Sequence, residues 1–195
     1  MEIAINDYGV GAAVATDLVN TSPTVRGAAG EALLGPDALA AFLGEHDLRP
    51  DAVAGGRALT EDDLFQVVLL RREVRAIVET ETEEQAVAGA AVLAGRAGLV
   101  PVLRRDADGG WQWYVPTAPD APLADELAAL IGIGLFGVVR ALGHERFRAC
   151  AAPDCRGVFV DISRAGRRRY CMPELCGNRL NVANHRARRM GSVAR

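Results

Sequence analysis

The sequence predicts a mostly helical α+β protein with two domains, residues 1–143 and residues 144–195. Three observations predict this organisation. Apolar residues recur at helical spacing through most of the first domain. One stretch near residue 100 alternates between apolar and polar side chains, as half-buried strands do. All four cysteines lie in the second domain, arranged as two pairs.

Three segments of the first domain combine helix-start signals with an apolar stripe: residues 35–48, 60–80 and 82–98. Pro36 takes a first helical position, and Thr60 is an N-cap followed by acidic residues that suit the helix dipole. Thr82 is also an N-cap, with Gln85 at the reciprocal position of a capping box. The side chains that we expect in the core are Leu39, Phe42, Leu43, Leu64, Val67, Val68, Val74, Ile77, Val78, Ala86, Ala90, Leu93 and Ala97.

Residues 99–116 change from the helical period to an alternating one. A turn over residues 106–110 separates two alternating segments, so we expect a β-hairpin. Trp111, Trp113 and Val115 then share one face, which predicts that both tryptophans lie in the core. The stretch AAVATDLVNT, which precedes the helix predicted at residues 35–48, is compatible with either a strand or a helix.

Residues 124–147 predict a long apolar helix that joins the two domains. Gly132, Gly134 and Gly137 match the spacing of the dinucleotide-binding fingerprint G-x-G-x-x-G. That fingerprint requires a preceding strand, a helix that starts at the glycines and an acidic residue about 20 positions later. These glycines instead lie inside a helical run, so we expect them to permit close contact between helices.

The charge of the chain also divides at the domain boundary. Residues 1–139 hold 9 Arg against 21 acidic residues, a net charge of −12, whereas residues 140–195 hold 13 Arg against 4 acidic residues, a net charge of +9. A compact basic region indicates a polyanionic partner. The sequence has no secretory signal pattern, and its longest uncharged apolar stretch is shorter than the roughly 20 residues that a membrane span needs. We therefore expect a cytoplasmic protein without a membrane partner.

The cysteines follow the pattern C-x4-C, fifteen residues, C-x4-C. Two such pairs can hold one zinc ion in a closed, tetrahedral, structural site whose ligands are Cys150, Cys155, Cys171 and Cys176. Disulfides would suit a secreted chain, and a redox dithiol normally has the spacing C-x-x-C. An iron centre remains an alternative, because thiolates also bind iron. A module of this size buries little apolar surface, so metal binding would supply folding free energy.

The sequence around the metal predicts a treble-clef or zinc-ribbon-like zinc finger. Residues 150–155 form the turn that carries the first cysteine pair. Residues 157–163 are expected to form a strand, and residues 167–171 the returning strand of a hairpin. A helix is expected from about Pro173 onward, with Cys176 near its first turn.

Arginines on the final helix and at the hairpin tip are the candidate contacts to double-stranded DNA. A basic helix that also carries amide side chains can bind phosphates along its length and base edges near its start. The same arginines can alternatively face solvent, donate to the sulfurs or bind the acidic first domain. The predicted nucleic-acid contacts are Arg167, Arg168, Arg169, Asn178, Arg179, His185, Arg186, Arg188 and Arg189.

Residues 176–179 spell CGNR, and the segment from Cys150 onward resembles the CGNR zinc-finger family of bacterial proteins. The stretches DLVNT (residues 17–21) and LLGPDALAAFLGEHDL (residues 33–48) resemble the ABATE domain that usually accompanies this finger. The resemblance implies one zinc ion on the four cysteines. It also implies a role for Asn178 and Arg179, either in contacting DNA or in bracing the zinc site. Proteins of this architecture are regarded as stress-induced transcription regulators, with the finger as the DNA-binding part.

The sequence contains no motif of an enzyme. Its three histidines, His46, His144 and His185, have neither metal-ligand nor nucleophile–base spacing, so no catalytic activity is expected. We expect a DNA-binding transcription regulator whose first domain senses a small-molecule effector or forms a homodimer. The alternative is a zinc-stabilised adaptor that binds an acidic protein and does not contact DNA.

Overall fold

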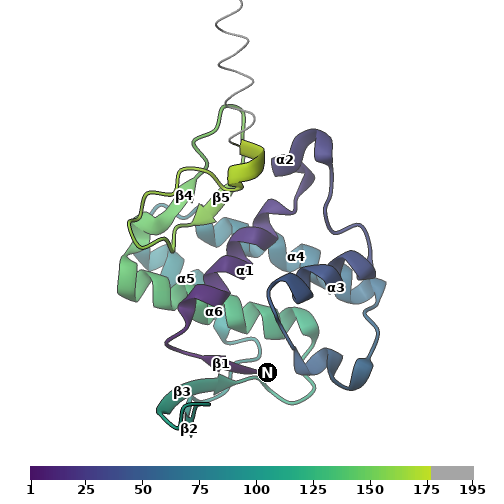
Figure 1. Cartoon of the computed structure of the whole chain (residues 1–195), viewed down its shortest axis with the longest axis vertical. Coiled ribbons are helices and arrows are strands. Elements are labelled where there is room, and N and C mark those ends of the chain that lie inside the picture. The colour runs from purple at the N-terminus through teal and green to yellow at the C-terminus, as the bar shows by residue number, and fades with distance from the viewer. Residues whose placement is uncertain (177–195) are drawn as a thin grey trace, which may run out of the picture.

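The computed structural model describes residues 1–176 and consists of a layer of helices with a small antiparallel sheet at each end (Figure 1). The sheet at one end has the strand order β1-β3-β2, and the sheet at the other end pairs β4 with β5. The elements are β1 (Glu2–Ala4), α1 (Tyr8–Asn20), α2 (Pro23–Arg26), α3 (Pro36–Glu45), α4 (Glu61–Val78), α5 (Glu83–Ala94), β2 (Val102–Arg105), β3 (Trp111–Pro116), α6 (Leu123–Leu142), β4 (Phe147–Ala149) and β5 (Val158–Val160).

The apolar helix α6 lies at the centre of the helical layer and packs against α5 and α1. Its glycines allow these contacts, as the sequence predicts. A Cβ atom added at Gly132 would lie 2.5 Å from the backbone nitrogen of Ala94 in α5, and one added at Gly134 would lie 2.7 Å from the Cα atom of Gly11 in α1. Since these neighbours are backbone atoms, larger side chains would separate the helices.

The helix-start signals of α3, α4 and α5 are confirmed. Pro36 occupies the first turn of α3. At α4, the Thr60 hydroxyl accepts a hydrogen bond from the Asp63 N–H (3.1 Å), and the Asp63 carboxylate accepts one from the Thr60 N–H (2.8 Å), which completes a capping box. At α5, Thr82 accepts from the Gln85 N–H. The Gln85 side chain, however, accepts from the residue before the N-cap.

The predicted apolar stripes are buried, except that Val68 is only partly buried. The undecided stretch AAVATDLVNT is helical and forms most of α1. This helix contacts α6 on one side and β5 on another, which explains why its apolar residues show no simple two-sided pattern.

The hairpin of β2 and β3 is confirmed, but the prediction that both tryptophans lie in the core is wrong. Trp111 is 62% exposed and Trp113 is 49% exposed, whereas Val115 on the same face is 7% exposed. Figure 1 shows that the hairpin lies at the edge of the helical layer, and only its base is covered by helices. Side chains on this face of β3 are therefore more exposed toward the hairpin tip. There the Arg105 guanidinium lies over the Trp111 ring, 4.5 Å from the ring centre.

The strand β5 joins the cysteine-containing end of the chain to the helical layer. Val158 and Val160 belong to the same hydrophobic cluster as α1, α4 and α6. Phe159, which points the other way along the strand, packs in a separate cluster with Val25 and Cys171. The division into folding units at residue 143 stays a prediction. None of the helices within residues 1–176 is long and apolar enough to cross a membrane.

Candidate metal centre

The four cysteine sulfurs converge on one point. The Sγ atom of Cys176 lies 3.6 Å from that of Cys150, 3.7 Å from that of Cys155 and 3.6 Å from that of Cys171. All four sulfurs lie within 4.8 Å of one another. Four sulfurs bound tetrahedrally at about 2.3 Å from a zinc ion would be separated by about 3.8 Å, so the observed spacing fits one zinc ion.

The first cysteine pair lies in the turn that connects β4 to β5. Cys150 directly follows β4, and its N–H donates to the carbonyl of Gly157 at 2.8 Å, which continues the strand pairing. The Cys155 N–H donates to the Ala152 carbonyl at 3.2 Å and closes the turn. Asp154 adopts a left-handed conformation (φ 59°), which a short polar side chain tolerates. The chain thus folds both sulfurs to one side.

The second pair spans a loop and the start of a helical turn. Residues 173–176 are helical, and the Cys176 N–H donates to the Met172 carbonyl at 2.8 Å. Cys176 therefore lies in a first helical turn, as predicted, while Cys171 precedes it. Both of these cysteines are buried, whereas Cys150 and Cys155 are partly exposed. A turn between two strands followed by a helical turn carries the ligands, in agreement with a treble-clef-like finger.

Backbone N–H groups point at two of the sulfurs. The Gly157 N–H donates to the Cys155 sulfur at 3.4 Å, and the Cys171 N–H donates to the Cys150 sulfur at 3.4 Å. Burial would raise the pKa of the Cys150 thiol, but N–H donors from Ala152 and Cys171 hold that pKa below its usual value. Burial and the neighbouring thiols raise the pKa of Cys171. A bound zinc ion offsets this cost because it stabilises all four thiolates.

Gly157 leaves room for the sulfur of Cys171. A Cβ atom at this position would lie 2.2 Å from the Cys171 sulfur and 2.9 Å from the Asn20 Oδ1 atom. Neither neighbour has free space in which to move, because Cys171 and Asn20 are both buried. Sequence reasoning missed this residue, since a glycine beside a metal ligand has no signal of its own.

We expect the substitution Gly157→Ala to weaken zinc binding about 10- to 100-fold, because the added methyl group must displace a ligand at a cost of about 1–3 kcal/mol. Competition with a chromophoric chelator measures the affinity. Gly44→Ala is the matched control, since a Cβ atom there meets nothing within 4 Å. Equal zinc affinity in the two variants would contradict this role of Gly157.

The predicted returning strand at residues 167–171 is wrong. Instead, β5 pairs antiparallel with β4, the strand that precedes it in the sequence, with Phe147 opposite Val160. The buried carboxylate of Asp161 ends the strand by accepting hydrogen bonds from the N–H and hydroxyl of Ser163 and from the N–H of Arg168. These bonds turn the chain away from the ladder into a loop.

Asp161 also pairs with Arg148, whose Nη1 atom lies 3.1 Å from the carboxylate. Burial would raise the pKa of Asp161, but the hydrogen bonds from Ser163 and Arg168 and the charge of Arg148 hold that pKa below its usual value. The carboxylate therefore stays ionised at neutral pH and keeps the loop closed.

Arg168 braces the second cysteine pair. Its guanidinium donates to the carbonyl oxygens of Tyr170 and Cys171 and lies over the Phe159 ring, 4.9 Å from the ring centre. Arg168, one of the predicted DNA contacts at the hairpin tip, therefore points into the finger instead of toward solvent.

The outer edge of β5 is held by α1. The Thr16 hydroxyl accepts a hydrogen bond from the Val160 N–H at 2.9 Å, and the Asn20 Nδ2 atom donates to the Val158 carbonyl at 2.7 Å. Both side chains are buried, and they satisfy backbone groups that would otherwise be unpaired at a strand edge. Polar residues inside the apolar stretch AAVATDLVNT were the available signal for this contact, which sequence reasoning did not use.

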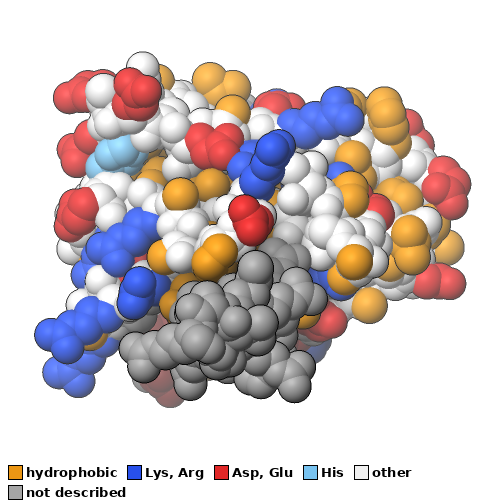
Figure 2. All heavy atoms as spheres, turned by 90° about the horizontal axis from the view of Figure 1, so that it is seen from above, with side chains coloured by type: hydrophobic (Ala, Val, Ile, Leu, Met, Phe, Trp, Pro, Cys, Tyr) orange, Lys and Arg blue, Asp and Glu red, His pale blue; other side chains and the backbone are white. Residues whose placement is uncertain are grey.

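The remaining predicted DNA contacts divide between the described part of the chain and its end. Arg167 and Arg169 are exposed. Figure 2 looks onto the finger end of the molecule and shows arginine side chains gathered along one edge of this face. The other predicted contacts, Asn178, Arg179, His185, Arg186, Arg188 and Arg189, lie outside the described residues, as does most of the predicted final helix.

Two family models match the chain. The CGNR zinc finger model matches residues 146–189, which include all four cysteines. The ABATE model, described as "putative stress-induced transcription regulator", matches residues 12–134, more than half of the chain. No curated protein matches. The matched finger and the converging sulfurs together show a site for one structural zinc ion. The chain therefore belongs to the ABATE family and carries a CGNR zinc finger after its ABATE domain.

Proposed function

We propose that this protein is a cytoplasmic transcription regulator that binds double-stranded DNA through its zinc finger and acts by binding rather than by catalysis. The observation that carries the proposal is that the arginines of the finger form two groups with different contacts. Some of them hold the zinc-binding loop together, while others on the same loop are exposed and have no acidic partner within residues 1–176.

The first group of arginines points inward. Arg146 donates to the carbonyls of Asp161 and Ser163, and Arg148 donates to the Asp161 carboxylate. With Arg168, these side chains join the loop to the two strands. The loop is therefore presented in one conformation, which reduces the entropy lost when it binds a partner.

The second group consists of Arg164, Arg167 and Arg169. All three side chains are exposed, and none forms an ion pair within the described residues. Arg169 lies near the Tyr170 ring, with 5.8 Å between its guanidinium carbon and the ring centre. Three unpaired guanidinium groups on one short loop can each bind a phosphate group.

The acidic domain does not neutralise these arginines through ion pairs. In the part of the chain that the structure describes, no ion pair joins an arginine of the finger to an acidic residue of residues 1–139. The hydrogen bonds between the two regions use neutral groups, apart from Arg75, which donates to the Arg156 carbonyl. Among the finger arginines, the inward-facing Arg168 interacts electrostatically with Asp17. An acidic body repels DNA, so it favours approach of DNA to the basic finger.

The test is binding of the zinc-loaded full chain to duplex DNA, measured by fluorescence anisotropy at several salt concentrations. Neutralisation of about six phosphates predicts a log–log slope of about −5. Replacing Arg164, Arg167 and Arg169 together with alanine should make the slope shallower by about 0.9 for each phosphate that the variant no longer binds, with zinc content unchanged. A pull-down of genomic fragments with the same protein then identifies the target sequence.

The double variant Arg49→Ala with Arg72→Ala is the matched control, because both arginines are exposed and belong to the acidic domain. It should bind DNA as the unmodified chain does. Absence of DNA binding by the zinc-loaded protein at about 50 mM salt would refute the proposal and favour the adaptor function. An equal loss of affinity in the control would refute the assignment of the loop.

A further inference from the structure

A cavity of about 460 Å³ lies between the turn that joins β1 to α1, the end of α5 with the loop after it, β3 and α6. Its lining residues all come from the first 140 positions of the chain, so it is separate from the zinc site. Its volume is within the range of about 300–1,000 Å³ that is common for small-molecule sites. We propose that this cavity binds a small amphipathic molecule with an apolar body and one carboxylate group.

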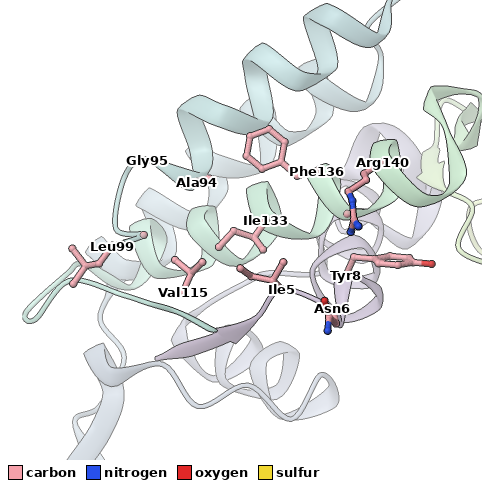
Figure 3. A pocket seen from close by; sticks show the side chains of 12 residues that line it. Ile5, Asn6, Tyr8, Ala94, Gly95, Leu99, Val115, Ile133, Phe136 and Arg140 are labelled. Atoms are coloured by element: carbon pink, nitrogen blue, oxygen red, sulfur yellow. The ribbon is translucent and has the colours of Figure 1, made fainter. Parts of the chain in front are cut away.

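The walls of the cavity are apolar and its polar groups lie together. Figure 3 shows Leu99, Val115 and Ile133 along one part of the cavity, with Arg140 and Asn6 toward the other end. An apolar ligand body would be buried against the first group, while a polar head would reach the second. This separation of apolar and polar lining matches an amphipathic molecule better than a uniformly polar one.

Small residues create the space. Four of the twelve lining residues are glycine or alanine, namely Ala94, Gly95, Gly98 and Gly137. Protein interiors are otherwise closely packed, so a cluster of small residues beside large apolar ones leaves unfilled volume. Gly137 also lets α1 approach, because a Cβ atom there would lie 2.2 Å from the Tyr8 Cβ atom.

Arg140 supplies the charge that selects a carboxylate. It lies in the last turn of α6, and within residues 1–176 its guanidinium has no ion pair or hydrogen bond. Most arginines of the acidic domain pair with carboxylates, as Arg71 with Glu31 and Arg57 with Asp63 show, whereas the exposed Arg72 and Arg105 form no ion pair within residues 1–176. An unpaired guanidinium at the rim of an apolar cavity is therefore available to a carboxylate of a ligand, which it can bind through two parallel hydrogen bonds.

The elements that line the cavity also hold the finger. Tyr8 begins α1, whose other end contacts β5 through Thr16 and Asn20. Arg140 precedes Gly143, from which the chain continues through a short 3-10 helix to β4. A bound molecule would join the start of α1 to the end of α6. An effect of this molecule on DNA affinity would rest on the proposed function, whereas its binding to the cavity does not.

The experiment is calorimetric titration of the zinc-loaded full chain with hexanoate, octanoate and decanoate, in the absence of DNA. We expect saturable binding, with roughly fourfold higher affinity for each added methylene group until the cavity is filled. 1-Octanol should bind more weakly than octanoate because it lacks the charge. 2-Naphthoate distinguishes an aromatic from an aliphatic body, and tight binding of either class of carboxylate supports the proposal.

Variants test the role of the guanidinium. Arg140→Ala should lower the octanoate affinity about tenfold, which is the loss expected for a hydrogen bond to a charged group, and leave 1-octanol binding unchanged. Arg140→Lys should restore part of the affinity. Arg72→Ala, at an exposed arginine that does not line the cavity, should change neither. Failure of every carboxylate to bind, or equal loss in Arg140→Ala and Arg72→Ala, would overturn the proposal while leaving the DNA-binding proposal untouched.

Discussion

Replacing Cys171 with serine should abolish stoichiometric zinc binding and unfold the finger. Cys171 is 1% exposed, and its sulfur lies 3.6 Å from those of Cys155 and Cys176. Zinc binding contributes about 10–16 kcal/mol to the folding of isolated zinc fingers, far more than the small apolar cluster around Phe159 can replace. Removal of one ligand should therefore disorder the loop that carries the exposed arginines.

Elemental analysis measures the zinc content of this variant, and hydrogen exchange locates the unfolding. Backbone amides of residues 161–176 should lose protection, whereas those of α6 should keep it, because α6 is buried among helices and holds none of the four cysteines. Removal of zinc from the unmodified chain with a strong chelator should give the same pattern. A Cys171→Ser variant with one zinc ion and an ordered finger would falsify the ligand assignment.

The substitution Asn20→Leu should lower the free energy of unfolding by about 2–3 kcal/mol, because it leaves a buried carbonyl without a donor. The Asn20 side chain is 2% exposed and donates to the carbonyls of Thr16 (2.6 Å) and Val158 (2.7 Å). Leucine is branched at Cγ like asparagine and is the larger side chain, so the loss does not come from a cavity. Urea denaturation measures the change.

Three further substitutions serve as comparisons for this result. Asn6→Leu removes an exposed hydrogen bond to Gln112 and should change stability by no more than about 0.5 kcal/mol. Thr16→Val removes the other contact to β5 and should act in the same direction as Asn20→Leu, while Thr16→Ser keeps the hydroxyl and should be milder. If Asn20→Leu proved no more destabilising than Asn6→Leu, α1 would not be an anchor of the finger.

Local signals in the sequence predicted much of this fold. Thr60 and Thr82 cap their helices, and Pro36 starts α3, because a helix start depends on residues within one turn of each other. The zinc site was predictable for a related reason. Four cysteines in two pairs on one short segment match the ligand spacing of a structural zinc site, and the structure places their sulfurs within 4.8 Å of one another.

The two wrong predictions have different causes, one distant in sequence and one local. Trp111, Trp113 and Val115 do share one face of β3, as their alternation predicts. The helices cover only the part of this face that carries Val115, so both tryptophans are exposed. The loop at residues 167–171 has the composition of a returning strand, yet the hydrogen bonds accepted by Asp161 end the ladder, and β4 is the partner of β5.

By itself, the sequence determined α3, α4, α5 and α6, the hairpin of β2 and β3, the metal site and the separation of charge, because each depends on side-chain types at short and regular spacing. Only the tertiary structure decided which arginines of the finger face outward, that α1 holds β5 through Thr16 and Asn20, and that small residues leave a cavity beside Arg140. These features arise where segments far apart in the chain meet, and spacing along one segment carries no information about the surface that will cover it.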